Sequence, residues 1–595
     1  MNAQALAEYL GTAVWPAAFV LPLALALGTI PRPTRAAAIS LTPTAALPAL
    51  LLALFGEVGE GGGARLPYIL IGMELGLTEV TRVFLLFTAL LWTVAAVYAL
   101  GYTEDDPRRG RFFAFFLLTM AGNLGLIIAR DLASFYLFFS LMSFLAYGVI
   151  VHEDTERARR AASVYLVMTV FGEACVLPAV LITAGLSGTV GIEAATAALA
   201  DSGALDAVVL LATLGFGVKA GAILLHLWLP LAHPAAPTPA SAVLSGTMIK
   251  AGLLGWMLLI PVGEVSMPAW GALFMAFGLL AAFYGVLVGV TQSDPKTVLA
   301  YSSISQMGFM TAALGAALAV PGAWPVAALA VPIYATHHAL AKGVLFLGVG
   351  VARKVAGLRD RSRRLLVVAG LLFASLAMAG GPLTSGAAAK EYLKEVAYLA
   401  PGGWENALLY GFDLAAVGTA VVMGRFLFSV WPEGGVDARP VASLALPWAF
   451  LLGALATSVL FLPVPRAELF SYLLGASAFW PVSAGALIVA GAWYLDGRSG
   501  GRLRERLMPG IPEGDLIVPV TRLLRALRGL WRSRVGPAAG SAGERLAALA
   551  RRYESGTATL RSAAQAVESG IRLWTVAGAL ALLLTLAVLT LSVLA

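Results

Sequence analysis

Charged residues and cysteine are both scarce in this sequence. Only 12% of the 595 residues are charged and 59% are hydrophobic, whereas charged residues approach a quarter of a soluble domain. A soluble globular protein is therefore excluded. Cys175 is the single cysteine, which excludes an intrachain disulfide and any CxxC iron–sulfur or zinc site. We expect no redox cofactor in this chain.

Long apolar runs are abundant instead. About sixteen runs of roughly 18 to 25 residues, each long enough to cross about 30 Å of hydrocarbon as a helix, recur from end to end. The run from Thr12 to Gly28 has neither the basic leader nor the cleavage site of a signal peptide, so we expect a retained span. The sequence therefore predicts an all-α polytopic membrane protein.

The positive charge is concentrated in one segment. The net charge is +7, but residues 498–572 hold 14 Arg against 6 acidic residues. In residues 520–535, Leu and Trp alternate with Arg at helical spacing, which predicts an amphipathic helix on the membrane surface in contact with lipid; a solvated basic linker is the alternative. A nucleic-acid partner is not expected. The positive-inside rule places this segment in the cytoplasm and both termini outside a cell inner (cytoplasmic) membrane.

Three lysines stand inside apolar stretches: Lys219, Lys250 and Lys342. A fourth, Lys390, lies in SGAAAKEYLKE. An ammonium group in hydrocarbon is costly unless it is paired, hydrated or neutralised, so these lysines predict a functional use. Burial disfavours the charged form of a lysine and a carboxylate restores it, so such a residue can exchange protons near neutrality. The pattern favours a proton relay.

Histidines accompany the lysines. His338 precedes Lys342 by four positions, so both lie on one helix face, where the imidazole can pass a proton between waters. His337 points about 100° away and is expected to be a simple hydrogen-bonded residue. His226 and His233 flank a proline-rich stretch, but no carboxylate or thiol lies nearby at ligand spacing, so no metal site is expected.

Acidic partners for the lysines are few. Glu173 is embedded in the predicted sixth span, and Asp413 and Arg425 lie on the thirteenth. Asp413 and Arg425 are about 18 Å apart along a helix and cannot pair with each other, so their partners must lie on other helices. Glu391 is expected nearer an aqueous end of the relay.

Two interruptions in the apolar runs point to broken helices. Four prolines, from Pro230 to Pro239, follow the predicted span 205–227, and Gly380, Gly381 and Pro382 lie within the predicted span 364–384. Such breaks are tolerated at membrane depth where the freed backbone is buried or lines a hydrated cavity. For residues 228–240, a broken span and a re-entrant loop between spans both remain open.

Four motifs in order then suggest a family: LHLWLPLAHPAAPTPASAVLSGTMIKAG, DPKTVLAYSSISQMGF, HALAKGVLFLG and GPLTSGAAAKE. Together they resemble the antiporter-like proton-translocating subunits of respiratory complex I, of membrane-bound hydrogenases and formate hydrogenlyases, and of multisubunit sodium/proton antiporters. AHPAAPTP and SGTMIKAG are most similar to the hydrogenase-4 and formate-hydrogenlyase large membrane subunit and to the D-type antiporter subunit. The resemblance covers residues of about 100 to 430.

The resemblance implies about fourteen core transmembrane helices in two inverted five-helix repeats, each with a broken helix, followed by a cytoplasmic surface helix and extra C-terminal transmembrane helices. The divisions are the N-terminal helices 1–111, the first repeat 112–261, the second repeat 269–430, the C-terminal helices 431–497, the basic segment 498–572 and the final helix 573–595. It also implies roles for individual residues. Lys219 matches the lysine of the first broken helix, Lys250 that of the next span, His338 and Lys342 a bridging pair, and Lys390 the exit lysine.

The sequence departs from the family at Ser140. In the family pattern, similar to FxxFWELMS, a glutamate on the fifth span pairs with the first relay lysine, but this chain reads FYLFFSLMS. Glu173 matches an acidic position on the sixth span of some members. We therefore expect Glu173 to supply the missing counter-charge to Lys219; a lysine held neutral, or a subunit that pumps poorly, are the alternatives.

The resemblance leaves three functions open. The first is proton or cation/proton translocation by a subunit of a redox-driven complex, with peripheral redox subunits on other chains. The second is a subunit of a cation/proton antiporter or of an inorganic-carbon uptake complex. The third is a non-conducting structural subunit, with Ser140 as its evidence. The sequence does not identify the driving reaction, the ion, the number of similar subunits or a quinone site.

Overall fold

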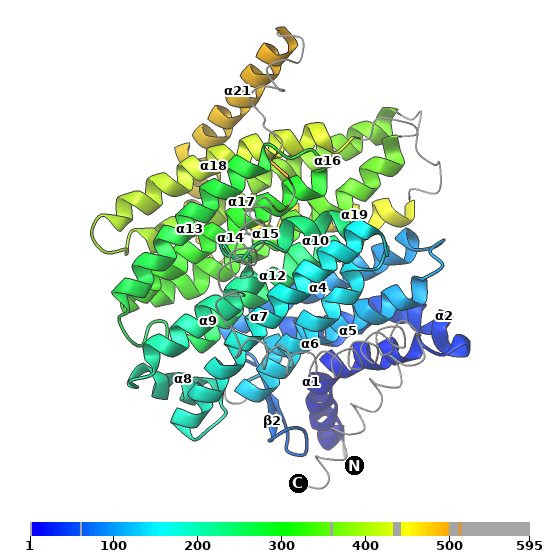
Figure 1. Cartoon of the computed structure of the whole chain (residues 1–595), viewed down its shortest axis with the longest axis vertical. Helices are drawn as coiled ribbons and strands as arrows, with labels where there is room; N and C mark the ends of the chain where they lie inside the picture. The colour runs from blue at the N-terminus through cyan, green and yellow to red at the C-terminus, as the bar shows by residue number, and fades with distance from the viewer. Residues whose placement is uncertain are drawn as a thin grey trace, which may run out of the picture.

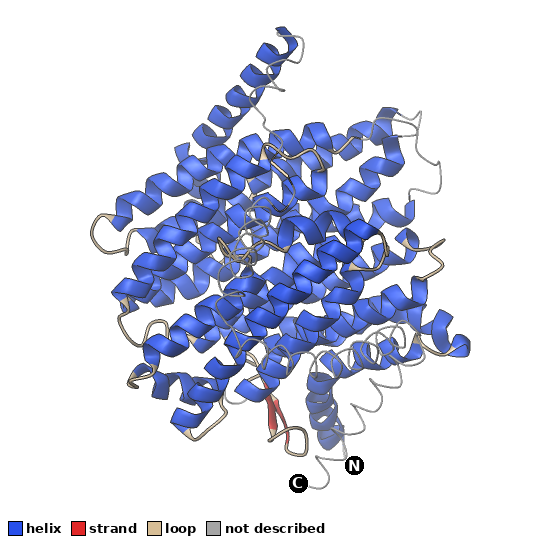
Figure 2. Cartoon of the chain, viewed as in Figure 1, coloured by secondary structure: helices blue, strands red, loops and turns tan. Residues whose placement is uncertain are grey.

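The protein is a bundle of membrane-spanning helices (Figures 1 and 2). The computed structural model describes residues 3–59, 62–356, 361–431, 442–498, 511–512 and 514. Ten helices in these ranges are long and apolar enough to cross a membrane, and two short strands accompany them. The chain is therefore an all-α, multi-pass membrane protein, as its composition predicted.

The N-terminal helices form one side of the bundle. They are α1 (Ala3–Gly28), α2 (Arg32–Leu41), η1 (Thr42–Ala46), α3 (Leu47–Phe55) and α4 (Glu79–Tyr102). A hairpin between α3 and α4 pairs β1 (Ala64–Leu66) antiparallel to β2 (Met73–Leu75). Thr78 begins α4 with a capping box, in which its side chain accepts from the backbone of Thr81. Packing of α4 against α11, α15 and α19 attaches this side to the rest of the chain.

The first repeat contains a broken fourth helix. Its elements are α5 (Arg109–Ile128), α6 (Leu132–Ile150), α7 (Glu156–Ser187), α8 (Ile192–Ala200), α9 (Leu205–Ala220), α10 (Leu229–Ala235), α11 (Thr238–Val243), the π-helical turn η2 (Leu244–Met248) and α12 (Ile249–Leu259). Helix α5 packs along α6, and α9 lies between α7 and α12. The halves α9 and α10 together make the fourth crossing of this repeat.

The second repeat follows a similar plan, without counterparts of α8 and η2. It comprises α13 (Pro268–Gly289), α14 (Pro295–Ala319), η3 (Pro321–Ala323), α15 (Trp324–Ala356), α16 (Arg361–Met378), α17 (Ser385–Ala397) and α18 (Trp404–Ser429). Helix α13 packs along α14, and α17 contacts α15 and α18, so the contacts of the first repeat recur. The fold therefore has a broken helix in each half. It continues through α19 (Ala442–Thr457), η4 (Ser458–Phe461), α20 (Arg466–Leu474) and α21 (Ala476–Arg498), and α21 extends beyond the bundle at the top of Figure 1.

The first break lies earlier than the prolines suggested. Helix α9 ends at Ala220, where Gly221 adopts a left-handed conformation with φ of 67°, and Leu224 follows with φ of 71°. The chain becomes helical again at Leu229, with Pro230 in the first turn. Proline is favourable at a helix start because its missing N–H would have no intrahelical partner there. Pro230 and Pro239 therefore lie in the first turns of α10 and α11, whereas Pro234 lies inside α10. The helix is interrupted between Ala220 and Leu229, as the broken-span interpretation requires.

The second break also differs from the predicted span 364–384. Helix α16 ends at Met378, and α17 begins at Ser385. Gly380 and Leu383 between them have positive φ values of 71° and 59°. Lys390 thus lies in the middle of a half-helix. The predicted basic segment 498–572 and final span 573–595 lie outside the described residues, apart from Arg498, Ile511, Pro512 and Gly514.

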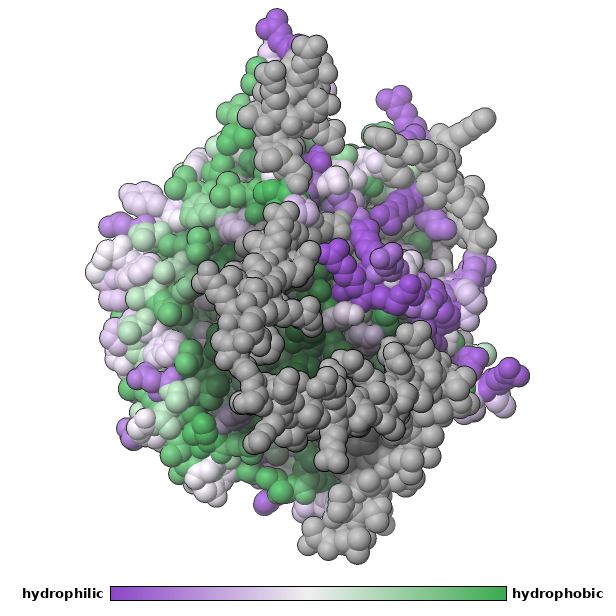
Figure 3. Space-filling view, viewed as in Figure 1, coloured by the Kyte–Doolittle hydropathy of each residue, from purple (hydrophilic) through white to green (hydrophobic). Residues whose placement is uncertain are grey.

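Burial distinguishes the inner helices from the outer ones. Every residue of α14 is buried, so this helix lies at the centre of the bundle. Outer helices such as α7 and α21 expose large apolar side chains, including Val167, Leu181 and Leu487, as expected of surfaces that face lipid. In Figure 3, hydrophobic residues gather mainly on the left of the visible face, and hydrophilic residues gather in one area to the right of centre.

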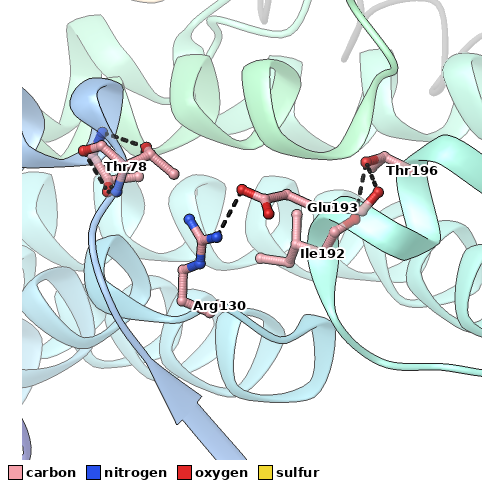
Figure 4. Close-up of polar contacts among 6 residues, drawn as sticks. Thr78, Arg130, Ile192, Glu193 and Thr196 are labelled. Atoms are coloured by element: carbon pink, nitrogen blue, oxygen red, sulfur yellow. Dashed lines mark hydrogen bonds and ion pairs between the residues drawn. The ribbon is translucent and has the colours of Figure 1, made fainter. Parts of the chain in front are cut away.

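Arg130 joins three elements at one end of the first repeat (Figure 4). Its guanidinium forms an ion pair with Glu193 of α8 at 2.7 Å. Its backbone N–H donates to Glu74 of β2, and its carbonyl accepts from the N–H of Ile192. The short surface helix α8 is thereby fixed to the loop between α5 and α6.

Candidate functional site

Lys219 lies at the end of the first half of the broken helix. Its side chain is buried, and Nζ donates to the hydroxyl of Tyr165 on α7 at 2.8 Å. The ammonium also lies 5.2 Å from the Tyr165 ring centroid and 6.0 Å from that of Trp228. Because Gly221 ends the helix just after Lys219, the lysine lies beside the break and faces these two aromatic rings.

Glu173 of α7 contacts Ser140 of α6, the residue at which the sequence resemblance predicts a departure from the family. The Ser140 hydroxyl on α6 donates to Oε2 of Glu173 at 2.6 Å. Glu173 is buried, and no hydrogen bond to Oε1 is present among the described residues. The carboxylate is close enough to Lys219 to interact with it electrostatically, although the two do not form a direct ion pair within the described chain. Glu173 and Lys219 thus lie in one buried region.

Lys250 follows the π-helical turn η2. Its Nζ donates to the carbonyl of Ser245, inside that turn, at 2.6 Å, and its side chain is fully buried. The Ser245 hydroxyl in turn bonds to the Ser303 hydroxyl on the central helix α14 at 2.8 Å. A π turn carries one residue more than an α turn and is frequent at functional sites. It positions Lys250 and Ser245 toward α14.

Lys342 of α15 bonds to the same part of α14. Its Nζ donates to the carbonyl of Leu299 at 2.7 Å and to the hydroxyl of Ser302. Ser302 is the neighbour of Ser303, which bonds to Ser245. Serines of α14 therefore lie between Lys250 and Lys342. Within the described residues, these two lysines bond to neutral oxygens only.

The two adjacent histidines of α15 have different surroundings. His338 lies within electrostatic range of Lys250 and Lys342, and neither of its ring nitrogens has a hydrogen-bond partner in the described part of the chain. His337 is also buried, and its Nδ1 lies 2.9 Å from the Ser385 hydroxyl at the start of α17. His338 thus faces the lysines of the centre, and His337 faces the second half-helix.

A small polar cavity adjoins His337 and Lys390. It has room for roughly one water molecule. Tyr334, Gln306 and Thr419 also line it, and Gln306 bonds to both Tyr334 and Thr419. The cavity therefore lies between His337 and Lys390, the exit lysine predicted from the sequence.

Asp413 of α18 lies between two lysines of α17. One carboxylate oxygen is 3.3 Å from Nζ of Lys390 and 2.8 Å from Nζ of Lys394, and the other accepts from Lys394 at 2.9 Å. Glu391 forms a further ion pair with Lys394 at 3.4 Å. The expected partners of Asp413 on another helix are thus present. Glu391 is 21% exposed on its side chain, which places it toward an edge of the site.

Three buried groups of the site were not predicted from the sequence to belong to the relay. Lys296 begins α14 and donates to the carbonyl of Ala236 at 2.7 Å. His233 of α10 stacks near the ring of Phe346 at 4.7 Å, within electrostatic range of Lys250, Lys296 and Lys342. Lys394 pairs with Asp413. The two lysines belong to charged runs, DPK and KEYLKE, that are typical of solvated helix ends.

Two further candidates from the sequence, Arg425 and His226, lie in contacts that hold helices and loops together. Arg425 donates from Nε to the carbonyl of Gln292 at 2.8 Å, in the loop between α13 and α14. The His226 ring lies 5.2 Å from that of Tyr284. These contacts of Arg425 and His226 are with groups other than the relay lysines. Across the described ranges, three or more histidine, cysteine or acidic side chains do not come together in an arrangement that could hold a metal ion.

Comparison with known proteins finds a matching family and similar structures. Residues 129–404 match the family described as NADH:quinone oxidoreductase/Mrp antiporter, transmembrane. Hydrogenase-4 component B of Escherichia coli is 31% identical over 294 residues, which are 48% of this chain and 44% of that protein. The D-type subunit of the sodium/proton antiporter of Alkalihalophilus pseudofirmus is 26% identical over 398 residues, covering 63% of this chain and 76% of the relative. The chain spans less than half the length of hydrogenase-4 component B.

Solved structures share the fold. A chain of the Mrp complex from Dietzia sp. superposes with a TM-score of 0.69 and 23% identity, over 92% of this chain and 62% of that one. A chain of respiratory complex I from Thermus thermophilus superposes with a TM-score of 0.63 and 25% identity, over 79% of this chain and 99% of that one. Residues 129–404 thus resemble the antiporter-like family of membrane subunits, the family that the four motifs indicated.

Proposed function

We propose that this chain moves protons across a membrane through a buried relay formed by Lys219, Lys250, His338, Lys342 and Lys390. The observation that carries the proposal is the arrangement of buried ammonium groups with a carboxylate at each end. Glu173 is near Lys219 at one end, and Asp413 is paired with Lys390 at the other. Buried lysines are costly, and a row of them that only contributed to stability would be replaced easily by apolar residues.

Hydrogen-bonding groups between the lysines support a connected path. The serines of η2 and α14 lie between Lys250 and Lys342, and the polar cavity lies between His337 and Lys390. Buried ring nitrogens need hydrogen-bond partners, so water is the expected partner of His338. In this scheme His337 is the link from the central lysines to the second half-helix, because it contacts Ser385 and lines the cavity.

Glu173 takes the role of the missing fifth-span glutamate in this proposal. A charged Glu173 stabilises the ammonium form of Lys219, and neutralisation of Glu173 lets Lys219 release a proton toward Lys250. The hydrogen bond from Ser140 supports the carboxylate of Glu173 from the position that the family glutamate occupies. This contact weighs against the non-conducting alternative, because a chain that had lost conduction would have little reason to bury a carboxylate there.

Other membrane subunits are the expected partners. The similar structures are chains of an Mrp complex and of respiratory complex I, and a further one comes from a membrane-bound sulfane sulfur reductase. We infer that this chain belongs to a multisubunit membrane complex and that redox subunits on other chains drive it. A cation/proton antiporter is the second candidate, favoured by similarity over 76% of the length of the D-type antiporter protein.

The test is proton movement in liposomes that contain the full chain with its accompanying membrane subunits. A potassium diffusion potential drives protons, and a dye inside the vesicles reports pH. We expect Lys390→Ala to lower the proton flux by at least about tenfold, and Lys354→Ala, outside the relay at the end of α15, to leave it unchanged. Equal flux in all three proteins would contradict the relay. Copurification with iron–sulfur subunits would favour a redox-driven complex, and copurification with small antiporter subunits would favour a cation/proton antiporter.

A further inference from the structure

A short stretch between α19 and α21 lies against the two lysines of α17. It consists of residues 458–478, which include η4, α20 and the start of α21, and we call it the cover segment. The sequence predicted no separate role for it, because it falls within the predicted C-terminal helices 431–497. Its contacts, however, are with the exit lysine and with the two acidic residues that follow that lysine on α17.

Ser477 of the cover segment contacts α17 through two groups. Its backbone carbonyl accepts a hydrogen bond from Nζ of Lys390, and its hydroxyl donates to Glu391. The Lys390 ammonium is therefore shared between Asp413 of α18 and the cover segment. A lysine with two alternative partners on different elements can change between them when one element moves.

Two further hydrogen bonds hold the cover segment in place. The Tyr472 hydroxyl donates to Glu395 near the end of α17. The N–H of Leu383, in the break before α17, donates to the carbonyl of Leu473 at 3.1 Å. The segment is thus fixed at both ends of the half-helix, and side chains supply most of these bonds.

The buried apolar residues of the cover segment form a small cluster, while its partly buried Leu462, Val464 and Tyr472 pack against the main core. Ala387 and Ala388 of α17 pack with Val459, Leu473 and Ala478, and these five residues form their own buried cluster. The large core of the bundle does not include them. The cover segment thus has few fully buried contacts and meets the main core only through partly buried side chains, so opening it costs less free energy than moving an inner helix.

We propose that the cover segment is the gate at the exit of the relay, with Tyr472 and Ser477 as its positioning residues. This inference rests on the proposed function. In the closed state, the Ser477 carbonyl holds the Lys390 ammonium and the segment shields it from water. Opening releases Lys390, which gives a proton to water and becomes a neutral amine until the relay protonates it again. Glu391 and Glu395 are freed by the same movement and attract the departing proton.

A reversible cross-link tests the gate directly. Because Cys175 is the single native cysteine, Cys175→Ala gives a background without thiols. In it, Tyr472→Cys and Glu395→Cys place one thiol on each side of the contact, and a short bis-methanethiosulfonate reagent joins them. We expect the cross-linked protein to lose proton flux by about tenfold or more, and a reducing agent to restore it. The two single-cysteine variants treated with the same reagent are the controls.

The results separate the gate from the relay. Equal flux before and after cross-linking would overturn the gate, while flux that still depended on Lys390 would leave the proposed function standing. A Cys175→Ala parent without flux, or one in which Lys390→Ala has no effect, would overturn the proposed function and the gate with it.

A second measurement uses no reagent. Tyr472→Phe removes the bond to Glu395 and Ser477→Ala the bond to Glu391, so each favours the open state by about the strength of one hydrogen bond. We expect each to raise the passive flux by about fivefold and to shift its pH profile. Tyr398→Phe, at an exposed tyrosine after α17, is the matched control. Reduced flux with a lower unfolding temperature would indicate a structural role only and would overturn the proposal.

Discussion

The hydroxyl of Ser140 lies 2.6 Å from a carboxylate oxygen of Glu173. The sequence resemblance predicts that Ser140 replaces a glutamate of the family, and Glu173 extends toward Ser140 from the neighbouring helix α7. In the function that we propose, Glu173 therefore supplies the negative charge from the next helix, and the Ser140 hydroxyl contacts it. The lysine that it serves, Lys219, has no ion pair with it in the described chain and instead donates to Tyr165.

A reciprocal exchange tests this relationship. Glu173→Gln removes the carboxylate, and we expect the proton flux to fall by about tenfold or more because Lys219 loses its counter-charge. Ser140→Glu added to Glu173→Gln returns a carboxylate to the family position and should recover much of the flux. Vesicle flux assays measure both. Normal flux in Glu173→Gln would contradict the role given to Glu173.

Asp413 offers a prediction about stability. It neutralises Lys390 and Lys394 together, so Asp413→Asn leaves two buried ammonium groups without their shared carboxylate. We expect a loss of about 3 to 5 kcal/mol in the free energy of unfolding, seen as a lower unfolding temperature in detergent. Adding Lys394→Met should recover part of it, since one uncompensated charge is then removed. Asp201→Asn, at an exposed residue after α8, should change little. A double variant no more stable than Asp413→Asn would argue against the shared pairing.

Gly252 sets the distance between the helices of the first two relay lysines. A Cβ atom there would lie 2.4 Å from the carbonyl oxygen of Phe216 and 2.5 Å from the nitrogen of Ala220, both backbone atoms of α9. Gly252→Ala must therefore push α12 away from α9, and we expect a loss of about 1 to 3 kcal/mol together with reduced flux. Gly185→Ala on α7 is the control, because nothing lies within 4 Å of that position. Equal unfolding temperatures for the two variants would show that the helix contact tolerates the methyl group.

His152 gives a prediction about pH. It lies in the loop after α6, and its Nε2 is 2.6 Å from Asp106. Burial lowers the pKa of His152 below 6.5 more strongly than Asp106 raises it, so the folded protein favours the neutral ring. A depressed histidine pKa contributes stability that is complete above the unfolded value and is lost as the pH falls through the folded value. We expect the unfolding temperature to fall between about pH 7 and pH 5, and His152→Gln to flatten this dependence.

Asp106 acts in a different pH range. Burial alone would raise its pKa, but hydrogen bonds from His152 and from the backbone of Arg108 outweigh burial and hold the pKa below 3.8. The contribution of Asp106 to stability is therefore lost only in stronger acid, at a lower pH than the loss that His152 causes. Identical pH dependence in the native protein and His152→Gln between pH 7 and 5 would show that this histidine does not titrate in that range.

The membrane fold and the relay candidates were largely predictable because their signals are local. A lysine within an apolar run is visible in the sequence, and so is the helical spacing of His338 and Lys342. The position of the first break was not, because prolines are read as helix breakers, whereas Pro230 starts a half-helix and Gly221 ends the previous one.

Contacts between helices were beyond the reach of sequence patterns. That Glu173 meets Ser140, or that serines of α14 lie between Lys250 and Lys342, depends on which helices are neighbours. Lys394 was overlooked because the run KEYLKE is typical of a solvated helix end, and only the position of Asp413 makes it part of the site. The roles of the relay residues themselves remain predictions until flux is measured.

The π turn before Lys250 also bears on how such chains diverge. It holds one residue more than an ordinary α-helical turn, so deleting a single residue within 244–248 would restore a regular α-helix. The helix before the turn would then be rotated by about 100° relative to Lys250. An ammonium now directed at the central helix would then turn toward a different neighbour with no substitution at all. Deleting or inserting one residue in this turn would therefore alter the proposed transport more than most substitutions nearby. In an alignment of related chains, a one-residue gap there would mark a functional difference.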